Sequence, residues 1–357
     1  IASVSLLIFF TAAIVAQFIG GARLFEAIGV PYKVGLFIFA LTVVFYTAIG
    51  GFRAVVLTDA FQGIVMVCGT FALLFGIIRA GGGMEAISAR IMAQDPALLT
   101  PFGAGGFVTK PFILSFWILV CLGVIGLPHT AVRCMGYKDS RSMHRAIVIG
   151  TFVTGFLMLG MHLAGALGRG ALPGIEVVDS VIPTLTIKIL PPIFAGIFLA
   201  GPMASIMSTV DSQLLLASAA IINDLYVGYI NPDAAHNDSK VRRISFIVTA
   251  LIGVIVFLVA LNPPSLIVWI NLFAFGGLEA VFFWPIVMGL YWKRATASGA
   301  LASMIVGVVF FILLSQYSSI LHGVHPIVPT FVVTFVAFVI GSYMSRPSVD
   351  AVKKVWE

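Results

Sequence analysis

The chain has 357 residues, and its composition excludes an ordinary soluble globular protein. Of these residues, 60% are hydrophobic and only 10% are charged, and the mean hydropathy is +1.12. A soluble domain carries about a quarter charged residues, so these values indicate an integral membrane protein in a lipid bilayer. The net charge of +6 gives no indication of a nucleic-acid partner, because the basic residues are spread over the connections between apolar segments.

The cysteines and histidines do not suggest a metal centre. Cys68, Cys121 and Cys134 lie in or beside apolar runs, without metal-ligand spacing or a disulfide pattern, and the histidines are scattered. The chain starts at Ile1, without Met, inside an apolar helical pattern. We therefore expect a single transmembrane domain over residues 1–357 that is part of a longer protein.

The apolar segments are long enough to cross a bilayer as helices of roughly 20 residues each. A membrane barrel would show short alternating segments instead, so we predict an all-α protein. The predicted spans cover approximately residues 2–22, 35–50, 54–78, 112–132, 146–168, 191–222, 244–261, 265–291, 298–316 and 326–344.

The basic residues are divided unequally between the two sets of alternate connections. The larger set comprises Arg53, Arg133, Lys138, Arg141, Arg145, Lys240, Arg242, Arg243, Lys293, Arg294, Arg346, Lys353 and Lys354. The smaller set comprises Arg23, Lys33, Arg79, Arg90, Lys110, Arg169 and Lys188. Cytoplasmic loops are enriched in Lys and Arg, and long loops weigh little. The larger set is therefore predicted to be cytoplasmic, together with both ends of the chain.

The third predicted span begins with a polar group. Gly50 and Gly51 are expected to form a tight turn, and Asp59 and Gln62 follow about one to two turns into the helix. Asp59 and Gln62 share a helix face because they are three residues apart. A carboxylate at that depth needs a cation or hydrogen-bond donors. Two interpretations stay open: an ion path toward the cytoplasm, and an interaction with Arg53, whose side chain can snorkel.

The connections 79–111 and 169–190 are long and predicted to be external. Each contains a short amphipathic stretch, MEAISARIMAQ in the first and VVDSVIPTLTIKIL in the second. Such stretches are typical of lids over a binding site, and equally of surface helices without a gating role.

The fourth predicted span is interrupted by Gly123, Gly126 and Pro128. Proline removes a backbone donor and disrupts the turn before it. Carbonyl groups freed at membrane depth are tolerated where they line a cavity or meet protein, and discontinuous helices form substrate sites in secondary transporters. A plain proline kink without a ligand is the alternative. His129, directly after the break, fits local packing as well as a ligand contact.

The sixth predicted span carries a cluster of polar side chains in its middle. The cluster comprises Ser205, Ser208, Thr209, Asp211, Ser212 and Gln213. Ser205, Ser208 and Thr209 lie at i, i+3 and i+4, so a helix places them on one face. Neutral oxygens aimed at one point suit a small hard cation, whereas small residues that let helices pack closely are the alternative. Glu279, inside the span 265–291, is a further acid whose role is open.

Three segments resemble motifs of the sodium:solute symporter family. GGFRAVVLTDAFQG (50–63) resembles the family signature, GLPHTAVRCMGYKDS (126–140) its broken-helix segment, and MASIMSTVDSQLL (203–215) its sodium-site helix. The motifs occur in the family's order, and the similarity runs over the whole chain. On these residues the chain is identified as a member of the family.

The family resemblance implies a LeuT-type fold, with two inverted repeats of about five helices each plus peripheral helices. About three N-terminal spans of such a fold would then lie outside this chain. The resemblance implies that Ser208 and Thr209 ligate Na⁺, the co-transported ion and the one cofactor expected. It also implies that Ser205 contributes a carbonyl one turn earlier and that Asp59 assists sodium binding or release.

Four further stretches are similar to the bacterial members of the family that transport pantothenate. They cover residues 16–32, 123–134, 161–170 and 271–292. This resemblance implies symport of pantothenate and sodium across a bacterial inner membrane by alternating access, by a functional monomer. Another small organic solute, such as proline or another carboxylate, is the alternative substrate.

Pantothenate has a carboxylate, an amide and two hydroxyl groups, so its pocket needs hydrogen-bonding groups and a positive helix end or a cation. We predict that the break at Gly126, Pro128 and His129 supplies free amides. Gln17 and Gln213 are predicted to supply side-chain hydrogen bonds.

The remaining function classes have less support in the sequence. A membrane enzyme would need an acid, base or nucleophile set facing one cavity, and no such spacing is present. A sensor built on a transporter scaffold would normally carry a soluble signalling domain, and the segment after Arg346 is too short for one. A passive channel is a third alternative, and a test of sodium-driven accumulation separates it from a symporter.

Overall fold

The computed structural model describes residues 1–106, 108–172, 174, 178–236, 238–263 and 267–347. Within these ranges the side chains of residues 50–55, 178, 235, 236, 238 and 318–319 are not part of the description. Every regular element in the described ranges is a helix, and none is a strand. The prediction of an all-α protein is therefore confirmed.

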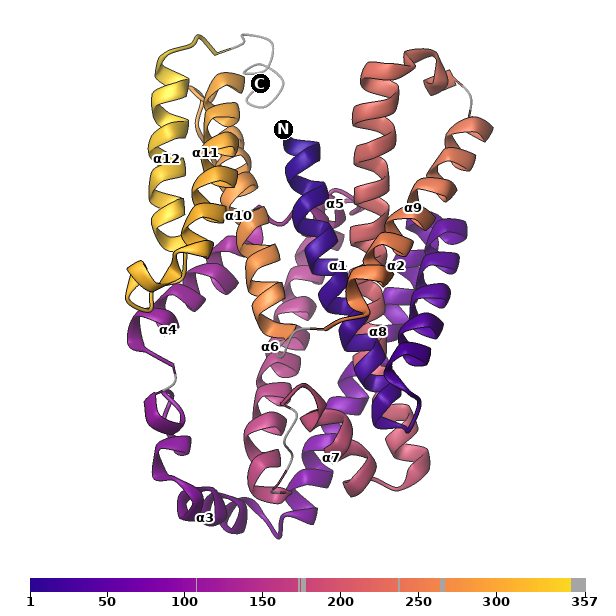
Figure 1. Cartoon of the computed structure of the whole chain (residues 1–357), viewed down its shortest axis with the longest axis vertical. Helices are drawn as coiled ribbons and strands as arrows, with labels where there is room; N and C mark the ends of the chain where they lie inside the picture. The colour runs from indigo at the N-terminus through magenta and orange to yellow at the C-terminus, as the bar shows by residue number, and fades with distance from the viewer. Residues whose placement is uncertain (107, 173, 175–177, 237, 264–266, 348–357) are drawn as a thin grey trace. The chain divides into compact units, whose positions relative to one another are not determined.

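Figure 1 shows the helices in chain order. The long ones are α1 (Ala2–Ala27), α2 (Tyr32–Ala80), α6 (Ser140–Ala171), α8 (Pro192–Ala219), α9 (Asp238–Ala260), α10 (Ile267–Tyr291), α11 (Ala297–Gln316) and α12 (Ile327–Tyr343). The shorter ones are α3 (Met84–Gln94), α4 (Lys110–Trp117), α5 (Pro128–Cys134) and α7 (Val181–Ile189). A π-helical segment, Ala220–Ile230, continues α8.

Among the described residues, 8 helical segments are long and apolar enough to cross a membrane. The count rises to 9 if the bent pair Lys110–Gly126 and Pro128–Cys134 is one span. α12, with 17 residues, is a shorter apolar helix at the position of the last predicted span. The chain is therefore a multi-pass membrane protein, and a helix is present at each of the predicted positions.

The second and third predicted spans both belong to α2. Its two apolar segments are Tyr32–Ile49 and Val56–Ala80, and each is long enough to cross a membrane. The tight turn predicted at Gly50 and Gly51 is wrong, because α2 runs as one helix through both residues, and glycine permits a turn without requiring one. The side chain of Arg53 is not part of the description.

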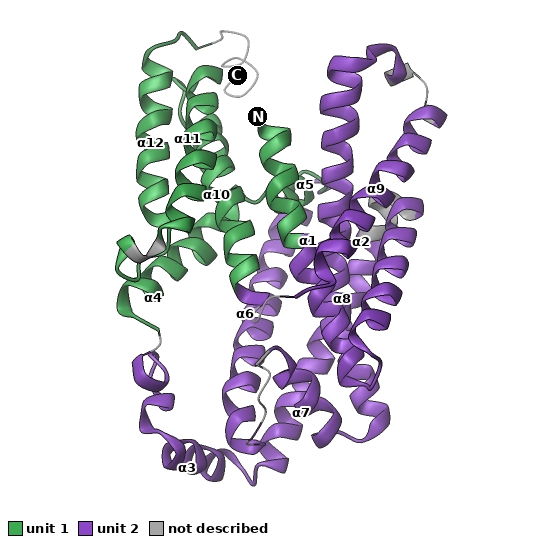
Figure 2. Cartoon of the chain, viewed as in Figure 1, with its two compact units in different colours: residues 1–13, 107–136, 269–357 green, residues 14–106, 137–268 purple. Residues whose placement is uncertain are grey.

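The chain divides into two compact units, each made of segments that are distant in sequence (Figure 2). Unit 1 comprises residues 1–13, 107–136 and 269–357, and therefore holds the start of α1, the broken span and α10 to α12. Unit 2 comprises residues 14–106 and 137–268. The single domain over 1–357 stays a prediction.

The two amphipathic stretches of the long connections are helices that pack on the bundle of unit 2. Ile87 and Ile91 of α3 and Leu185 of α7 are buried in one core cluster with Leu73 of α2 and Phe198 of α8. Glycine at position 168 of α6 allows this packing, because a β-carbon there would overlap the Leu185 side chain. Both connections are thus anchored by apolar contacts.

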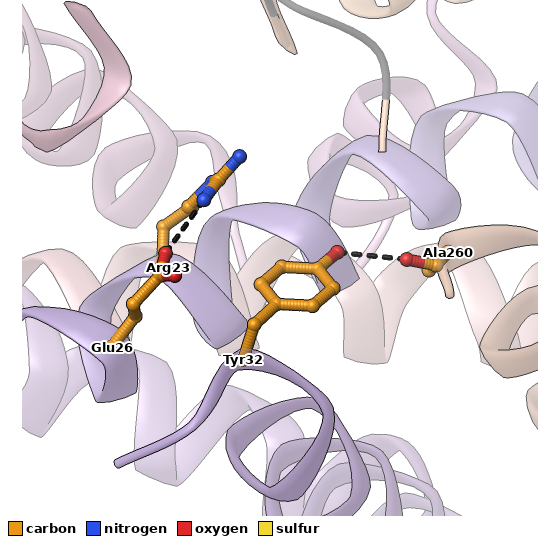
Figure 3. A network of polar contacts seen from close by, with 4 residues as sticks. All are labelled: Arg23, Glu26, Tyr32 and Ala260. Atoms are coloured by element: carbon orange, nitrogen blue, oxygen red, sulfur yellow. Dashed lines mark hydrogen bonds and ion pairs between the residues drawn. The ribbon is translucent and has the colours of Figure 1, made fainter. Parts of the chain in front are cut away.

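A polar network joins α1, α2 and α9 within unit 2 (Figure 3). Arg23 Nη1 donates to Glu26 Oε2 at 2.6 Å, and the Arg23 guanidinium lies 5.2 Å from the centroid of the Tyr32 ring. Tyr32 donates its hydroxyl proton to the carbonyl of Ala260 at 2.7 Å. Ala260 ends α9, where the last carbonyls of a helix have no partner within it. Tyr32 therefore gives a hydrogen-bond partner to a carbonyl at a buried helix end.

Candidate functional site

The predicted sodium ligands lie together on α8. Ser208 Oγ donates to the carbonyl of Ser205 at 3.0 Å, and Thr209 Oγ1 donates to the same carbonyl at 3.1 Å. All three residues are half-buried. A hydroxyl that gives its proton to the backbone keeps lone pairs on its oxygen for a second partner. This face of α8, defined by Ser205, Ser208 and Thr209 and called the hydroxyl face below, presents oxygen acceptors as a cation site requires.

A small pocket of about 200 Å³ lies beside Ser205, between α2, α6 and α8. Its lining is mostly apolar, and its polar groups include Ser205 and Thr70. A β-carbon on Gly201 would lie 3.5 Å from the Cα of Met66, which is an ordinary van der Waals contact between α8 and α2. Gly201 therefore lies on the face of α8 that packs against α2, and the close-packing interpretation of the Ser and Thr residues stays open.

Asp211 fixes α8 to α2 through two hydrogen bonds. Tyr46 donates its hydroxyl proton to Asp211 Oδ1, and Thr47 Oγ1 donates to the same oxygen at 2.7 Å. Asp211 and Thr47 are fully buried. Asp211 lies about 200° around the helix from Thr209. The side of α8 that bonds α2 through Asp211 is therefore roughly opposite to the side that carries Thr209.

Sequence reasoning did not find Tyr46 and Thr47. The available signal is weak: two adjacent hydroxyl side chains near the end of an apolar span, with no charge beside them. Asp211 was recognised as part of the polar cluster and received no role. Hydrogen bonds to a charged group contribute about 1.5–3 kcal/mol, so these residues determine how firmly the hydroxyl face is oriented.

The two predicted glutamines of the substrate pocket both belong to unit 2. Gln213 is fully buried on α8, and neither its Oε1 nor its Nε2 has a hydrogen-bond partner among the described residues. Gln17 is half-buried on α1. It lies three residues before Gly20, where a β-carbon would be 3.3 Å from Ile206 Cδ1 of α8. Gln17 is therefore on the face of α1 that packs against α8.

Asp59 and Gln62 also belong to unit 2, in the second apolar segment of α2. Both side chains are half-buried. Gln62 Oε1 is buried without a hydrogen-bond partner in the described part of the chain. The alternative partner for Asp59, the side chain of Arg53, is outside the described residues. A role for Asp59 in sodium binding or release stays a prediction.

The fourth span is broken where the sequence predicts it. After α4, the chain forms a π-helical turn over Ile118–Leu122 and a 3₁₀ turn over Gly123–Gly126, and α5 begins at Pro128. The two halves differ in direction by 51°. Leu127 is extended, with φ −88° and ψ 110°, as expected for the residue before a proline. The local backbone rule therefore explains the break.

Gly126 and His129 make close packing contacts within unit 1. A β-carbon on Gly126 would lie 3.0 Å from the backbone of Phe283 on α10. The His129 ring lies between Phe10 and Phe275, with centroid distances of 5.7 and 6.2 Å, and its Nδ1 is buried without a partner among the described residues. These contacts support the packing interpretation of Gly126. The substrate roles of Gly126, Pro128 and His129 stay predictions.

The structure thus groups the predicted site residues by unit. Unit 2 contains Asp59, Gln17, Gln213 and the hydroxyl face, and unit 1 contains the break at Gly126, Pro128 and His129. The hydroxyl groups of the predicted sodium site are in unit 2, and a discontinuous backbone is present in unit 1.

Comparison with known proteins gives matches over most of the chain. Residues 1–307 match the sodium:solute symporter family. The chain is 53% identical over 351 residues to the sodium/pantothenate symporter of Haemophilus influenzae, covering 98% of this chain and 72% of the relative. It is 54% identical over 343 residues to that of Escherichia coli, covering 96% and 71%. The osmoregulated proline transporter of Bacillus subtilis is 34% identical over 355 residues, covering 97% and 70%.

Proposed function

Because the chain belongs to the sodium:solute symporter family, we propose that it carries pantothenate together with Na⁺ across a bacterial inner membrane by alternating access. The family and the similar relatives are transporters, so the protein is not an enzyme. The choice of pantothenate over proline rests on the difference in sequence identity to the relatives named for each substrate. It is 53% and 54% to relatives named for pantothenate, against 34% to one named for proline.

The hydroxyl face of α8 is the proposed sodium site. Its support is local: two hydroxyl groups and one carbonyl oxygen meet at Ser205, and both hydroxyl protons are given to the backbone. Asp59, in the same unit, is proposed to assist binding or release of the ion. Hydroxyl and carbonyl oxygens grouped in this way are ligands that a hard cation such as sodium accepts.

The proposed substrate contacts come from the two glutamines and the broken span. A buried amide without partners costs about 1–3 kcal/mol, and a polar solute that hydrogen-bonds Gln213 would remove that cost. Gln17, Gly126, Pro128 and His129 complete the proposed set. The protein is proposed to act as a monomer in the bilayer, with a LeuT-type inverted repeat and with both ends of this chain cytoplasmic.

Uptake by the full-length protein tests the function. Cells or proteoliposomes that contain the protein should accumulate labelled pantothenate when a sodium gradient is present and lose it when the gradient collapses. Excess unlabelled pantothenate should compete, and excess proline should not. Accumulation of proline instead would show that proline is the substrate. Accumulation of pantothenate without sodium would show that transport is not coupled to sodium.

Two substitutions test the sodium site. Ser208→Ala and Thr209→Ala each remove one oxygen from a site with few ligands, so each should raise the sodium concentration for half-maximal uptake about ten-fold, a loss near 1.4 kcal/mol. Thr151→Ala is the matched control, because Thr151 donates to Ile147 one turn earlier in the same way but is exposed on α6. Sodium dependence that is identical in all three variants would remove the assignment of this face.

A further inference from the structure

Glu279 is a buried acid inside a membrane span that the proposed sodium and substrate sites do not use. It lies near the middle of α10, and only 1% of the residue is exposed. Its Oε2 is buried without a hydrogen-bond partner among the described residues. A lone carboxylate at membrane depth is costly, and such groups are usually neutralised by a partner, a proton or an ion. The Glu279 carboxylate therefore needs a positively charged partner, such as a proton or a metal ion.

One face of α10 presents Glu279 to the broken span. Phe275, Glu279 and Phe283 are spaced four residues apart, so they lie in a row along the helix. Phe275 contacts the ring of His129 and Phe283 packs on Gly126, as described above. Between these two in the row, Glu279 packs on Gly123, where a β-carbon would overlap its carboxyl group. The carboxyl group is thus in direct contact with the backbone of the break.

Gly123 is the residue at which the π-helical turn changes to the 3₁₀ turn. Its own N–H donates to the carbonyl of Ile118, five residues earlier. Pro128, further along, has no N–H to give to the carbonyls of this segment. Irregular backbone of this kind leaves carbonyl oxygens that can coordinate a cation. The glycine at position 123 lets the Glu279 carboxyl group approach this backbone.

The other polar groups around Glu279 do not offer a fixed positive charge. Two histidines belong to neighbouring elements: His129 faces Phe275, and His325 Cε1 would lie 3.2 Å from a β-carbon on Gly276. No ion pair that involves Glu279 is found among the described residues, where Arg23–Glu26 is present. No fixed positive charge is therefore paired with the Glu279 carboxyl group in the described part of the chain.

We propose that the Glu279 carboxylate, set against the backbone of the broken span at Gly123, binds a small monovalent cation, either sodium or a proton, at a second cation site in unit 1. Carboxylate and carbonyl oxygens are the ligands that hard cations prefer. This site uses none of the residues of the hydroxyl face, which belong to unit 2. Neutralising Glu279 would also weaken its repulsion of an anionic solute. This consequence rests on the proposed function.

The first experiment counts sodium ions on the purified full-length protein with ²²Na⁺. Glu279→Gln preserves the shape and removes the charge, and Glu85→Gln is the matched control because Glu85 is exposed on α3. If the cation is sodium, Glu279→Gln should bind one ion fewer per molecule at saturation than the wild type, while Glu85→Gln is unchanged. This count needs no pantothenate, so its result does not depend on the proposed substrate.

The second experiment separates a proton from sodium. If the cation is a proton, the sodium count is unchanged, and sodium-driven uptake between pH 5.5 and 8.5 loses one titration step in Glu279→Gln. That titration step should persist in the control Glu85→Gln. It should also persist in His325→Gln, a variant that removes the neighbouring imidazole outside the broken span. An unchanged sodium count together with an unchanged pH profile in Glu279→Gln overturns the proposal.

Two further variants keep the test decisive if Glu279→Gln does not fold. Gly123→Ala places a methyl group against the carboxyl group, and Glu279→Asp shortens its reach. Each should weaken the same cation several-fold, seen as a higher half-saturating sodium concentration or as a displaced pH step. Wild-type sodium binding and a wild-type pH profile in both variants contradict the proposal.

Discussion

At the scale of single residues, buried acids divide into those with donors and those without. Asp211 receives two hydroxyl protons from α2, from Tyr46 and Thr47. Glu279 Oε2 has no hydrogen-bond partner among the described residues, and its carboxyl group lies against the backbone at Gly123 instead. A carboxylate with fixed donors, such as Asp211, is a structural anchor, whereas Glu279, beside an irregular backbone, is the proposed cation ligand. The chemistry of each acid therefore follows from what faces it and not from its residue type.

Tyr46→Phe tests the anchor. The change removes one hydrogen bond to a buried carboxylate, so the free energy of unfolding should fall by about 1.5–3 kcal/mol. Tyr229→Phe is the control, because Tyr229 is 85% exposed and should change stability little. Equilibrium unfolding of the purified protein in mixed micelles measures both. Equal stability of the two variants would mean that the contact with Asp211 contributes little.

At the scale of elements, the broken span combines a local cause with a distant support. Pro128 interrupts the helix, and the two halves are then held by α10, which packs on Gly126 and Gly123. A glycine at each contact lets the backbones and the carboxyl group approach. The break is therefore a packed feature of unit 1 with little room for larger side chains.

Gly126→Ala tests this packing. A β-carbon 3.0 Å from the backbone of Phe283 forces the helices apart, so stability should fall by about 1–3 kcal/mol. Gly155→Ala is the matched control: Gly155 is inside α6 with nothing within 4 Å, so alanine should be neutral or stabilise by about 0.5–1 kcal/mol. Thermal unfolding of both variants in detergent gives the comparison.

The same comparison bears on the substrate role of the break. If Gly126→Ala lowers the amount of folded protein while binding of labelled pantothenate per folded molecule is normal, Gly126 acts by packing. If binding per folded molecule falls as well, the break contributes to the pocket. Measuring folded protein and bound substrate on one sample separates the two.

At the scale of the whole molecule, the distribution of basic residues predicts the orientation. The segment around Lys138 belongs to the predicted cytoplasmic set, and α3 belongs to a predicted external connection. Both Lys138 and Glu85 are exposed, so each accepts a probe without disturbing packing. The positive-inside rule therefore becomes directly testable at two surface positions.

Cysteine labelling in intact cells checks this orientation. In a background in which Cys68, Cys121 and Cys134 are replaced, Glu85→Cys should react with a membrane-impermeant maleimide added outside. Lys138→Cys should react only after the cells are permeabilised. The reverse pattern would invert the topology, and with it the predicted cytoplasmic location of both ends.

Much of the fold could be predicted because it depends on local properties of the chain. Hydrophobicity over about 20 residues identifies a membrane helix whatever its neighbours are, and the predicted spans correspond to helices. The break at Pro128 follows from a missing N–H and a restricted preceding residue. The common face of Ser205, Ser208 and Thr209 follows from the helical period alone.

The sequence by itself therefore determined the class of protein, the positions of its helices, the break and the hydroxyl face. Only the tertiary structure decided which distant groups meet: Tyr46 with Asp211, Phe283 with Gly126, and Glu279 with Gly123. The physical reason is that close packing and hydrogen bonding between helices determine how helices in a membrane associate. Those contacts depend on the rotation and depth of each helix, which no periodicity within one segment specifies.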